Sequence, residues 1–151
     1  MVPKTEVLDA RQCWTLLGET SVGRLAVTVD GRPDVFPVNY KVDQQTLIFQ
    51  TGGGTKFRAI QGGAHVAFEA DAVSAEFGLA WSVVVKGRAE VADPANTTLG
   101  TPGRALFPWQ GFNKEHFIRI VPELVTDRRF AIGAPLTWRA PLNDVIRAGL
   151  E

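Results

Sequence analysis

Residues 23–51 read GRLAVTVDGRPDVFPVNYKVDQQTLIFQT, and this stretch decides the fold class. Apolar residues alternate from Leu25 to Val29 and lead into Asp30-Gly31, a dipeptide typical of two-residue hairpin turns. Two further strand-like runs follow, over residues 35–42 and 46–51. The stretch therefore predicts three consecutive antiparallel strands that form a meander.

The rest of the chain adds three more strand-like runs, at residues 65–71, 81–91 and 117–125. Gly87 lies inside the longest of them and predicts a bulge or bend, as a barrel corner requires. Pro122 marks a bulge or an edge position in the last run. Six short strands with few helices predict a mainly β protein that forms a small closed or partly open antiparallel barrel.

Helical signals are short and lie between the strands. Asp9 followed by Gln12 has the capping-box pattern, which predicts a helix from about Ala10 to Leu17 that ends at Gly18. Other short helices are predicted at residues 56–61, 94–107 and 144–150. No repeat or linker divides the chain, so we expect one domain over residues 1–151, with 131–151 as a C-terminal extension of unassigned role.

Charge and cysteine content narrow the function classes. Sixteen Lys and Arg residues balance sixteen Asp and Glu residues, so broad neutralisation of nucleic-acid phosphates is not expected. The single cysteine, Cys13, is predicted to be a small buried hydrophobe rather than a reactive thiol. No apolar run approaches the roughly 20 residues of a membrane helix, and the N-terminus has no apolar signal segment. We expect a cytoplasmic protein that binds neither nucleic acid nor membrane.

The motifs of protein-only catalysis are missing. The sequence contains no G-x-S-x-G, H-E-x-x-H or C-x-x-C pattern, so hydrolase and zinc-site interpretations are disfavoured. His65 and His116 have no ligand-spaced partner, and each is predicted to be a surface or half-buried strand residue. Glu69 and Asp71 are two residues apart on a strand and share one face, either as a paired-carboxylate site or as a solvated surface.

The strongest chemical signal is the glycine-rich segment over residues 49–57, FQTGGGTKF. It matches neither the dinucleotide fingerprint nor the P-loop, because Phe57 replaces a glycine of the first and Thr55 precedes Lys56. Backbone N–H groups, a threonine at a helix start and two cations, Lys56 and Arg58, nevertheless favour an anion. From these residues alone, a phosphate loop and a simple capped turn are equally supported.

A succession of motifs runs along the predicted strands: Gly23-Arg24-Leu25-Ala26, Pro37-Val38-Asn39-Tyr40, Phe49-Gln50-Thr51 with Thr55-Lys56, Val66-Ala67-Phe68-Glu69, and residues 81–89. In order and spacing the succession resembles the FMN-binding split-barrel family related to pyridoxamine 5'-phosphate oxidase, from about Leu8 to Arg129. The resemblance implies an antiparallel split barrel. It also implies a homodimer with two FMN sites at the subunit interface.

The resemblance also implies a set of cofactor-binding residues, carried over by position. One group would lie along the isoalloxazine ring: Pro37, Val38, Asn39 and Tyr40. A second group would hold the ribityl chain and phosphate: Phe49, Gln50, Thr51, Thr55 and Lys56. A third group would approach the ring, the first two residues from the neighbouring subunit: Trp81, Ser82 and Trp109. Val38, Phe49 and Trp81 fit a role in the core equally well.

The resemblance therefore predicts a flavoprotein oxidoreductase that acts on an unidentified small molecule, with no catalytic side chain assigned and no metal. The arginine pattern that closes a true pyridoxamine phosphate oxidase is missing, since Arg128-Arg129-Phe130 leads into a different tail. Relatives of this type also use the deazaflavin F420 or bind haem, so an F420-dependent reductase and a non-catalytic flavin- or haem-binding module are the alternatives. One Lys in a compact glycine loop fits the single phosphate of FMN best.

Overall fold

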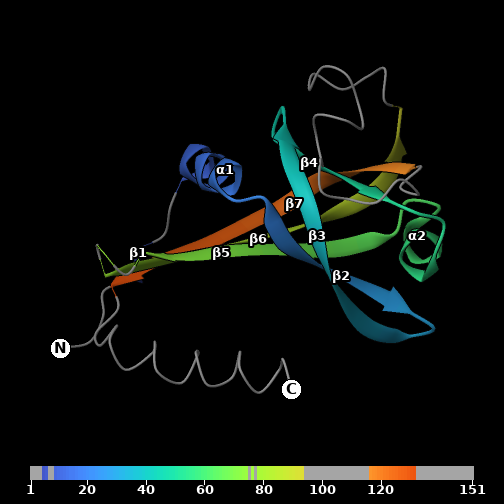
Figure 1. Ribbon diagram of the computed structural model, residues 1–151, viewed down its shortest axis with the longest axis horizontal. Helices are drawn as coiled ribbons and strands as arrows, with labels where there is room; N and C mark the ends of the chain where they lie inside the picture. The colour runs from blue at the N-terminus through green and yellow to red at the C-terminus, as the bar shows by residue number, and fades with distance from the viewer. Residues whose placement is uncertain (1–4, 7–8, 75, 77, 94–115, 132–151) are drawn as a thin grey trace.

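The computed structural model describes residues 5–6, 9–74, 76, 78–93 and 116–131. They form one antiparallel sheet and two helices, in chain order β1 (Thr5–Glu6), α1 (Ala10–Glu19), β2 (Val22–Val29), β3 (Arg32–Asp43), β4 (Thr46–Thr51), α2 (Thr55–Ile60), β5 (His65–Ser74), β6 (Leu79–Ala92) and β7 (His116–Ala131) (Figure 1). The predicted helices at 94–107 and 144–150 and the site residue Trp109 lie outside the described residues.

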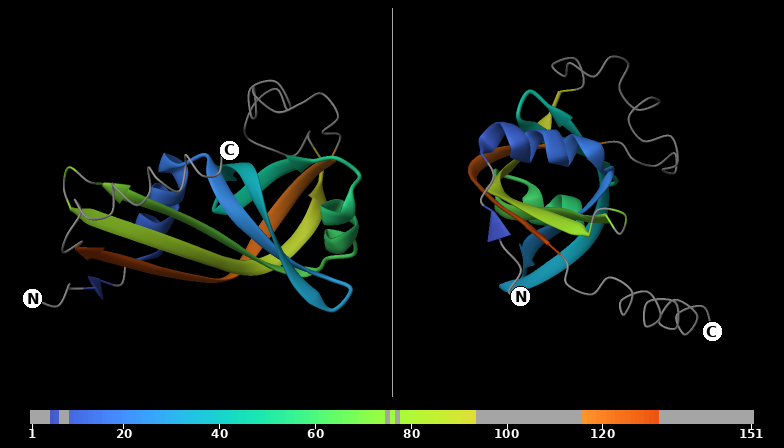
Figure 2. Two further views of the ribbon diagram at one scale, coloured as in Figure 1. Left: turned by 60° about the horizontal axis from the view of Figure 1, so that its bottom comes forward. Right: turned by 90° about the vertical axis from the view of Figure 1, so that its left-hand side faces the viewer.

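The sheet closes on itself. Its strand order is β1-β7-β4-β3-β2-β5-β6, and an additional pairing of β6 with β7 joins the two sides. Viewed end-on, the strands form a ring (Figure 2, right). In the side view β5, β6 and β7 continue beyond the other strands as an arm, formed by residues 70–74, 79–84 and 126–131 (Figure 2, left). The predicted antiparallel split barrel is thus confirmed.

The predicted meander is present in the order expected. Asp30 and Gly31 both have positive φ, 51° and 76°, as a primed two-residue hairpin turn requires. β2 and β3 pair from Val29 opposite Arg32 to Val22 opposite Asn39. The second turn also uses left-handed backbone, at Gln44 and Gln45. Local turn chemistry therefore sets the register of β2, β3 and β4.

A β-bulge bends the longest strand pair where it was predicted. The register of β6 against β7 shifts between Lys86 and Gly87, and Pro122 lies opposite Gly87. An ideal Cβ on Gly87 would lie only 2.0 Å from the carbonyl oxygen of Val121. Only glycine allows the two backbones to approach so closely, and the bend there turns the arm into the barrel.

Helix α1 covers one side of the barrel and buries Cys13 and Leu17. The predicted capping box is present, since Asp9 and Gln12 exchange side-chain to backbone hydrogen bonds. The prediction that Gly18 ends the helix was wrong. Gly18 does not have the positive φ of a terminating glycine, and the helix continues to Glu19 with Thr20 as its C-cap. In the described part of the chain no helix is long and apolar enough to cross a membrane.

The interior of the barrel is apolar. The largest fully buried side chains include Tyr40, Phe49 and Phe68, and the rings of Tyr40 and Phe68 meet edge to face at 4.7 Å between centroids. The hydroxyl of Tyr40 donates to the carbonyl oxygen of Leu17 at 2.6 Å and shares a hydrogen bond with Thr20. These bonds satisfy a buried phenol and attach α1 to β3.

Candidate functional site

The cofactor-binding residues predicted on β3 and β4 divide between the two faces of the sheet. Val38 and Phe49 point into the core, the packing role that the sequence left open for them, and Tyr40 is buried beside them. Pro37 and Asn39 alternate with them on the outer face. The prediction carried the motif over as one group and did not apply the period-two alternation of a strand, which places neighbouring residues on opposite faces.

Asn39 carries an unsatisfied acceptor. Its side-chain oxygen Oδ1 is buried, and within the described residues it has no hydrogen-bond partner. An unpaired buried polar atom destabilises a protein by about 1–3 kcal/mol, so such atoms usually have a partner. Gln50, which follows Phe49 on β4, is also buried, at 7% exposure. Asn39 thus has a buried acceptor to which the described residues offer no donor.

The glycine loop leads from β4 into α2, and its two predicted phosphate-binding side chains point in different directions. The ammonium group of Lys56 lies 5.7 Å from the ring centre of Phe36 and 5.9 Å from that of Phe49. Thr55 instead lines a 620 Å³ pocket between α2 and the tip of the β2–β3 hairpin. Arg58 lines the same pocket and donates to Thr55 Oγ1 at 3.4 Å. The loop therefore presents cations on two sides.

Trp81 and Ser82 lie far from the glycine loop of the same chain. β7 pairs with β4 at its start, where His116 is opposite Thr51, and with β6 at its end, where Arg129 is opposite Trp81. At about 3.3 Å per residue, the strand between these two positions spans roughly 40 Å. The glycine loop and the Trp81–Ser82 pair therefore lie near opposite ends of β7.

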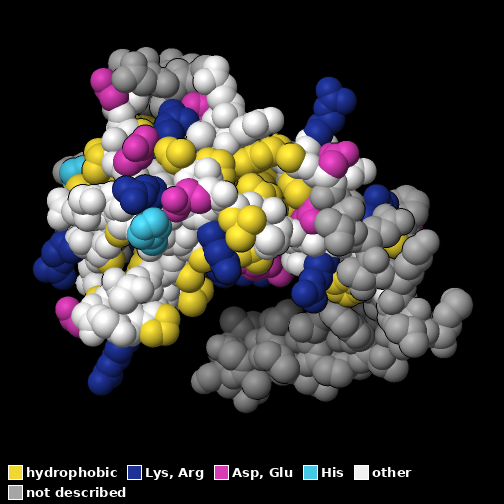
Figure 3. All heavy atoms as spheres, turned by 180° about the vertical axis from the view of Figure 1, so that it is seen from behind, with side chains coloured by type: hydrophobic (Ala, Val, Ile, Leu, Met, Phe, Trp, Pro, Cys, Tyr) yellow, Lys and Arg dark blue, Asp and Glu magenta, His cyan; other side chains and the backbone are white. Residues whose placement is uncertain are grey.

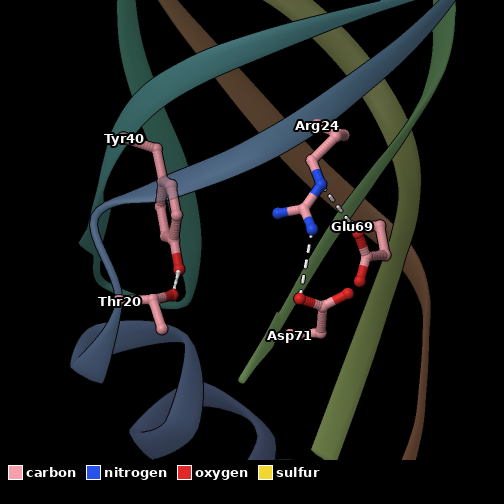
Figure 4. Close-up of polar contacts among 5 residues, drawn as sticks. All are labelled: Thr20, Arg24, Tyr40, Glu69 and Asp71. Carbon is pink, nitrogen blue, oxygen red and sulfur yellow. Dashed lines mark hydrogen bonds and ion pairs between the residues drawn. The ribbon is translucent and has the colours of Figure 1, made fainter. Parts of the chain in front are cut away.

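A second cluster of polar side chains lies on the outer face of the sheet, at Arg24, Glu69 and Asp71 (Figure 4). Arg24 Nε is 3.4 Å from Glu69 Oε2, and Arg24 Nη2 is 3.1 Å from Asp71 Oδ1. Burial raises the pKa of Glu69 to about 7, with further contributions from its hydrogen bond to Asp71 and from the Asp71 charge, while Arg24 opposes the shift. The predicted shared face of the two carboxylates is confirmed, and the arginine that joins them is new.

The two histidines are surface or half-buried strand residues, as predicted. His65 Nδ1 lies 3.2 Å from Glu123 Oε1 on an exposed part of the sheet. His116 is half-buried and stacks on Phe57, with ring centres 3.9 Å apart. Among the residues that the structure describes, no group of three His, Cys, Asp or Glu side chains is arranged to hold a metal ion.

The outer surface of the barrel mixes exposed apolar and charged side chains. Exposed large hydrophobic residues of the described strands include Val22, Val35, Val73 and Leu124, each about half exposed. In the view from behind, hydrophobic side chains spread across the middle of the molecule among Lys, Arg, Asp and Glu (Figure 3). The sheet is therefore not covered by a uniformly polar surface.

A closed antiparallel barrel with a projecting arm, a glycine loop and two short helices places the protein in the split-barrel class. The chain belongs to the pyridoxamine 5'-phosphate oxidase family, which it matches over residues 9–129. The resemblance inferred from the sequence motifs is thus confirmed.

Three relatives illustrate this membership. A candidate pyridoxamine 5'-phosphate oxidase of Corynebacterium glutamicum is 32% identical, with a TM-score of 0.71 over 88% of this chain and 98% of that one. The FAD-binding protein of Mycobacterium smegmatis is 31% identical, with a TM-score of 0.63 over 84% of this chain and 99% of that one. An uncharacterised protein of Mycobacterium tuberculosis is 35% identical over 92 residues, which are 61% of this chain and 82% of that protein.

Proposed function

We propose that this protein is a flavin-binding oxidoreductase that acts on a small molecule, as a homodimer with an FMN at each of two subunit interfaces. The observation that carries the proposal is the buried Oδ1 of Asn39, which has no hydrogen-bond partner among the described residues and lies on the strand that the family resemblance assigns to the isoalloxazine ring. The FAD-binding relative from M. smegmatis, 31% identical, supports a flavin as the ligand.

The residues present fit such a cofactor. The oxidised ring of a flavin carries one N–H donor, and the described residues offer no such donor to Asn39 Oδ1. The glycine loop leaves open space, since a Cβ on Gly53 or Gly54 would meet nothing within 4 Å. Lys56 supplies a cation beside this loop for the phosphate. A bound flavin supplies the electron transfer, and the chain supplies binding, orientation and electrostatics.

The distance along β7 supports the homodimer. A second copy would bring its Trp81 and Ser82 to the flavin beside Lys56, because within one copy these residues pair with the end of β7 that lies away from the glycine loop. In a two-fold assembly each copy gives its arm to the other, so two equivalent sites form. The site is then complete only in the dimer.

The identity of the flavin is a separate part of the proposal. One lysine beside a compact glycine loop fits the single phosphate of FMN, whereas the long acidic tail of F420 needs a broader basic groove. FAD is the second candidate, favoured by the M. smegmatis relative and by the 620 Å³ pocket that Thr55 and Arg58 line.

The test begins with the absorption spectrum of the purified protein and of the compound that heat releases from it. Titrations of the apoprotein with FMN, FAD and F420, followed by flavin fluorescence, then rank the three cofactors. We expect FMN to bind most tightly. Oxidation of NAD(P)H in the presence of a quinone or a nitro compound is the expected activity. A protein that binds none of the three cofactors would overturn the proposal, and a bound flavin that no nicotinamide reduces would favour a non-catalytic module.

A further inference from the structure

We propose that the pocket between α2 and the tip of the β2–β3 hairpin binds an adenosine 5'-phosphate group, with its phosphate on Arg58 and a ribose hydroxyl on Asp30. Two ligands carry this group, FAD in its adenylate half and the reductants NADH and NADPH in theirs. The inference rests on the proposed function, since it names the part of the cofactor or of the reductant that the chain holds next to the flavin phosphate.

The two walls of the pocket come from elements that lie at the same end of the barrel (Figure 1). α2 contributes Thr55, Arg58 and Ala59, which share one face of the helix because they are three and four residues apart. The hairpin contributes residues 28–30, the end of β2 and the first residue of the turn. The volume of 620 Å³ lies within the range of about 300–1,000 Å³ that is typical of small-molecule sites. A phosphate ion alone would fill only a small part of it, whereas a nucleotide fits.

Arg58 is the cation of this pocket. Its side chain is exposed, and its guanidinium group donates to Thr55 Oγ1 at the long distance of 3.4 Å. None of the ion pairs found within the described ranges involves Arg58. A guanidinium group donates through five N–H groups in a planar fork that matches the oxygens of a phosphate. Arg58 therefore has donors available for a phosphate bound in the pocket.

The other lining groups favour a nucleotide over a simple anion. Asp30 places a carboxylate in the same pocket, so the lining carries no net charge. Arg58 attracts a bare phosphate and Asp30 repels it, whereas a ribose phosphate presents its anion to the first and hydroxyl donors to the second. Thr28 and Thr55 add hydroxyl groups that both donate and accept, and the two remaining lining side chains are apolar, as a base requires. The pocket thus matches each part of an adenosine phosphate.

The pocket adjoins the proposed phosphate site of the flavin. Thr55 lines the pocket, whereas the ammonium group of the next residue, Lys56, lies near the rings of Phe36 and Phe49. Two consecutive residues thus face two different anion positions. In FAD the flavin phosphate and the adenylate phosphate are directly joined, and a reductant bound next to FMN brings the same two groups together. Neighbouring anion positions therefore suit an adenylate group that accompanies a flavin.

Calorimetric titration of the flavin-free full chain with AMP tests the pocket without any flavin. We expect saturable binding at one site per chain, and at least about tenfold weaker binding of adenosine, which lacks the phosphate. Arg58→Gln should weaken AMP binding at least about tenfold, because it removes the charge-assisted contact. Arg32→Gln is the matched control, since Arg32 is an exposed arginine of the same hairpin that does not line the pocket. It should change the AMP affinity by less than about twofold, because solvent and salt screen a charge at a distance.

A comparison of two cations separates this pocket from the flavin phosphate site. Arg58→Gln should weaken AMP binding and leave FMN binding unchanged, whereas Lys56→Ala should do the reverse. Thr28→Val, on the opposite wall, is a second variant of the pocket and should weaken AMP binding about threefold to tenfold, because it removes one neutral hydrogen bond. Far-UV circular dichroism confirms that each variant folds, and Thr28→Val decides the matter if Arg58→Gln does not.

Two further measurements identify the ligand that carries the adenylate group. If it is FAD, Arg58→Gln weakens FAD binding at least about tenfold while FMN binding is unchanged. If it is the reductant, Arg58→Gln raises the KM for NADH or NADPH of the FMN-loaded protein at least about tenfold, with kcat unchanged. A protein that does not bind AMP, or one in which Arg58→Gln weakens AMP binding no more than Arg32→Gln, overturns the inference. AMP binding that depends on Arg58 in a protein that binds no flavin overturns the proposed function instead.

Discussion

Replacing Gly87 with alanine should destabilise the barrel at its bend. The new Cβ would lie 2.0 Å from the Val121 carbonyl oxygen, 2.9 Å from the carbonyl carbon and 3.0 Å from the Cα of Pro122. All three are backbone atoms, so no side-chain rotation relieves the contact, and β6 and β7 must separate by roughly 1.5 Å to restore a normal distance. Overpacking costs about 1–3 kcal/mol and a weakened ladder hydrogen bond about 1 kcal/mol, so we expect a loss near 3 kcal/mol.

Urea unfolding at one protein concentration measures this loss as a lower midpoint concentration of urea with an unchanged slope of free energy against urea. The midpoint temperature of thermal unfolding should fall by about 6–12 °C. Gly18→Ala is the matched control. A Cβ on Gly18 would meet nothing within 4 Å, and the residue lies inside α1, so alanine should stabilise by about 0.5–1 kcal/mol. A Gly87→Ala protein as stable as the wild type would refute the inference that the bulge depends on a missing side chain.

Three further predictions concern single side chains. Lys56→Ala should weaken FMN binding about tenfold to a hundredfold in a fluorescence titration, because it removes a charge-assisted contact of about 1.5–3 kcal/mol. The control Arg11→Ala, at an exposed position, should leave FMN binding unchanged. The thiol of Cys13 donates to Asp127 at 2.6 Å, and burial together with this bond raises its pKa to about 12. Its reaction with a thiol reagent at pH 8 should therefore be at least about tenfold slower than in urea-unfolded protein. Arg119→Met removes the ion pair of 3.1 Å to the buried carboxylate of Asp43, and should lower the free energy of unfolding by about 3–5 kcal/mol in urea titrations.

The strands were predictable where the signals are local. Asp30-Gly31 fixes its own turn, and the third strand of the meander has the predicted bounds, Thr46–Thr51. The last strand was predicted to end at Val125, yet β7 continues to Ala131. Its final residues are paired with the start of β6 in the arm, and this pairing joins residues about fifty positions apart. No pattern within the strand itself reveals such a partner.

The candidate site shows the same limit. That Glu69 and Asp71 share a face follows from period-two alternation, so the sequence predicted it. That Arg24 joins them does not follow, because the guanidinium meets Asp71 across 47 positions of sequence. The directions of Thr55 and Lys56 were also beyond prediction, since they depend on the position of the β2–β3 hairpin relative to α2.

The pairing of β7 has a consequence for how the chain reaches its fold. β7 contacts β1, β4 and β6, and without it both β4 and β6 expose an unpaired edge. During synthesis the barrel thus stays open until residues 116–131 have left the ribosome, whereas the hairpin of β2 and β3 can form early. Such late, long-range closure is slow and leaves strand edges available to other chains. A nascent chain stalled before residue 116 should therefore aggregate more readily than one stalled after residue 131.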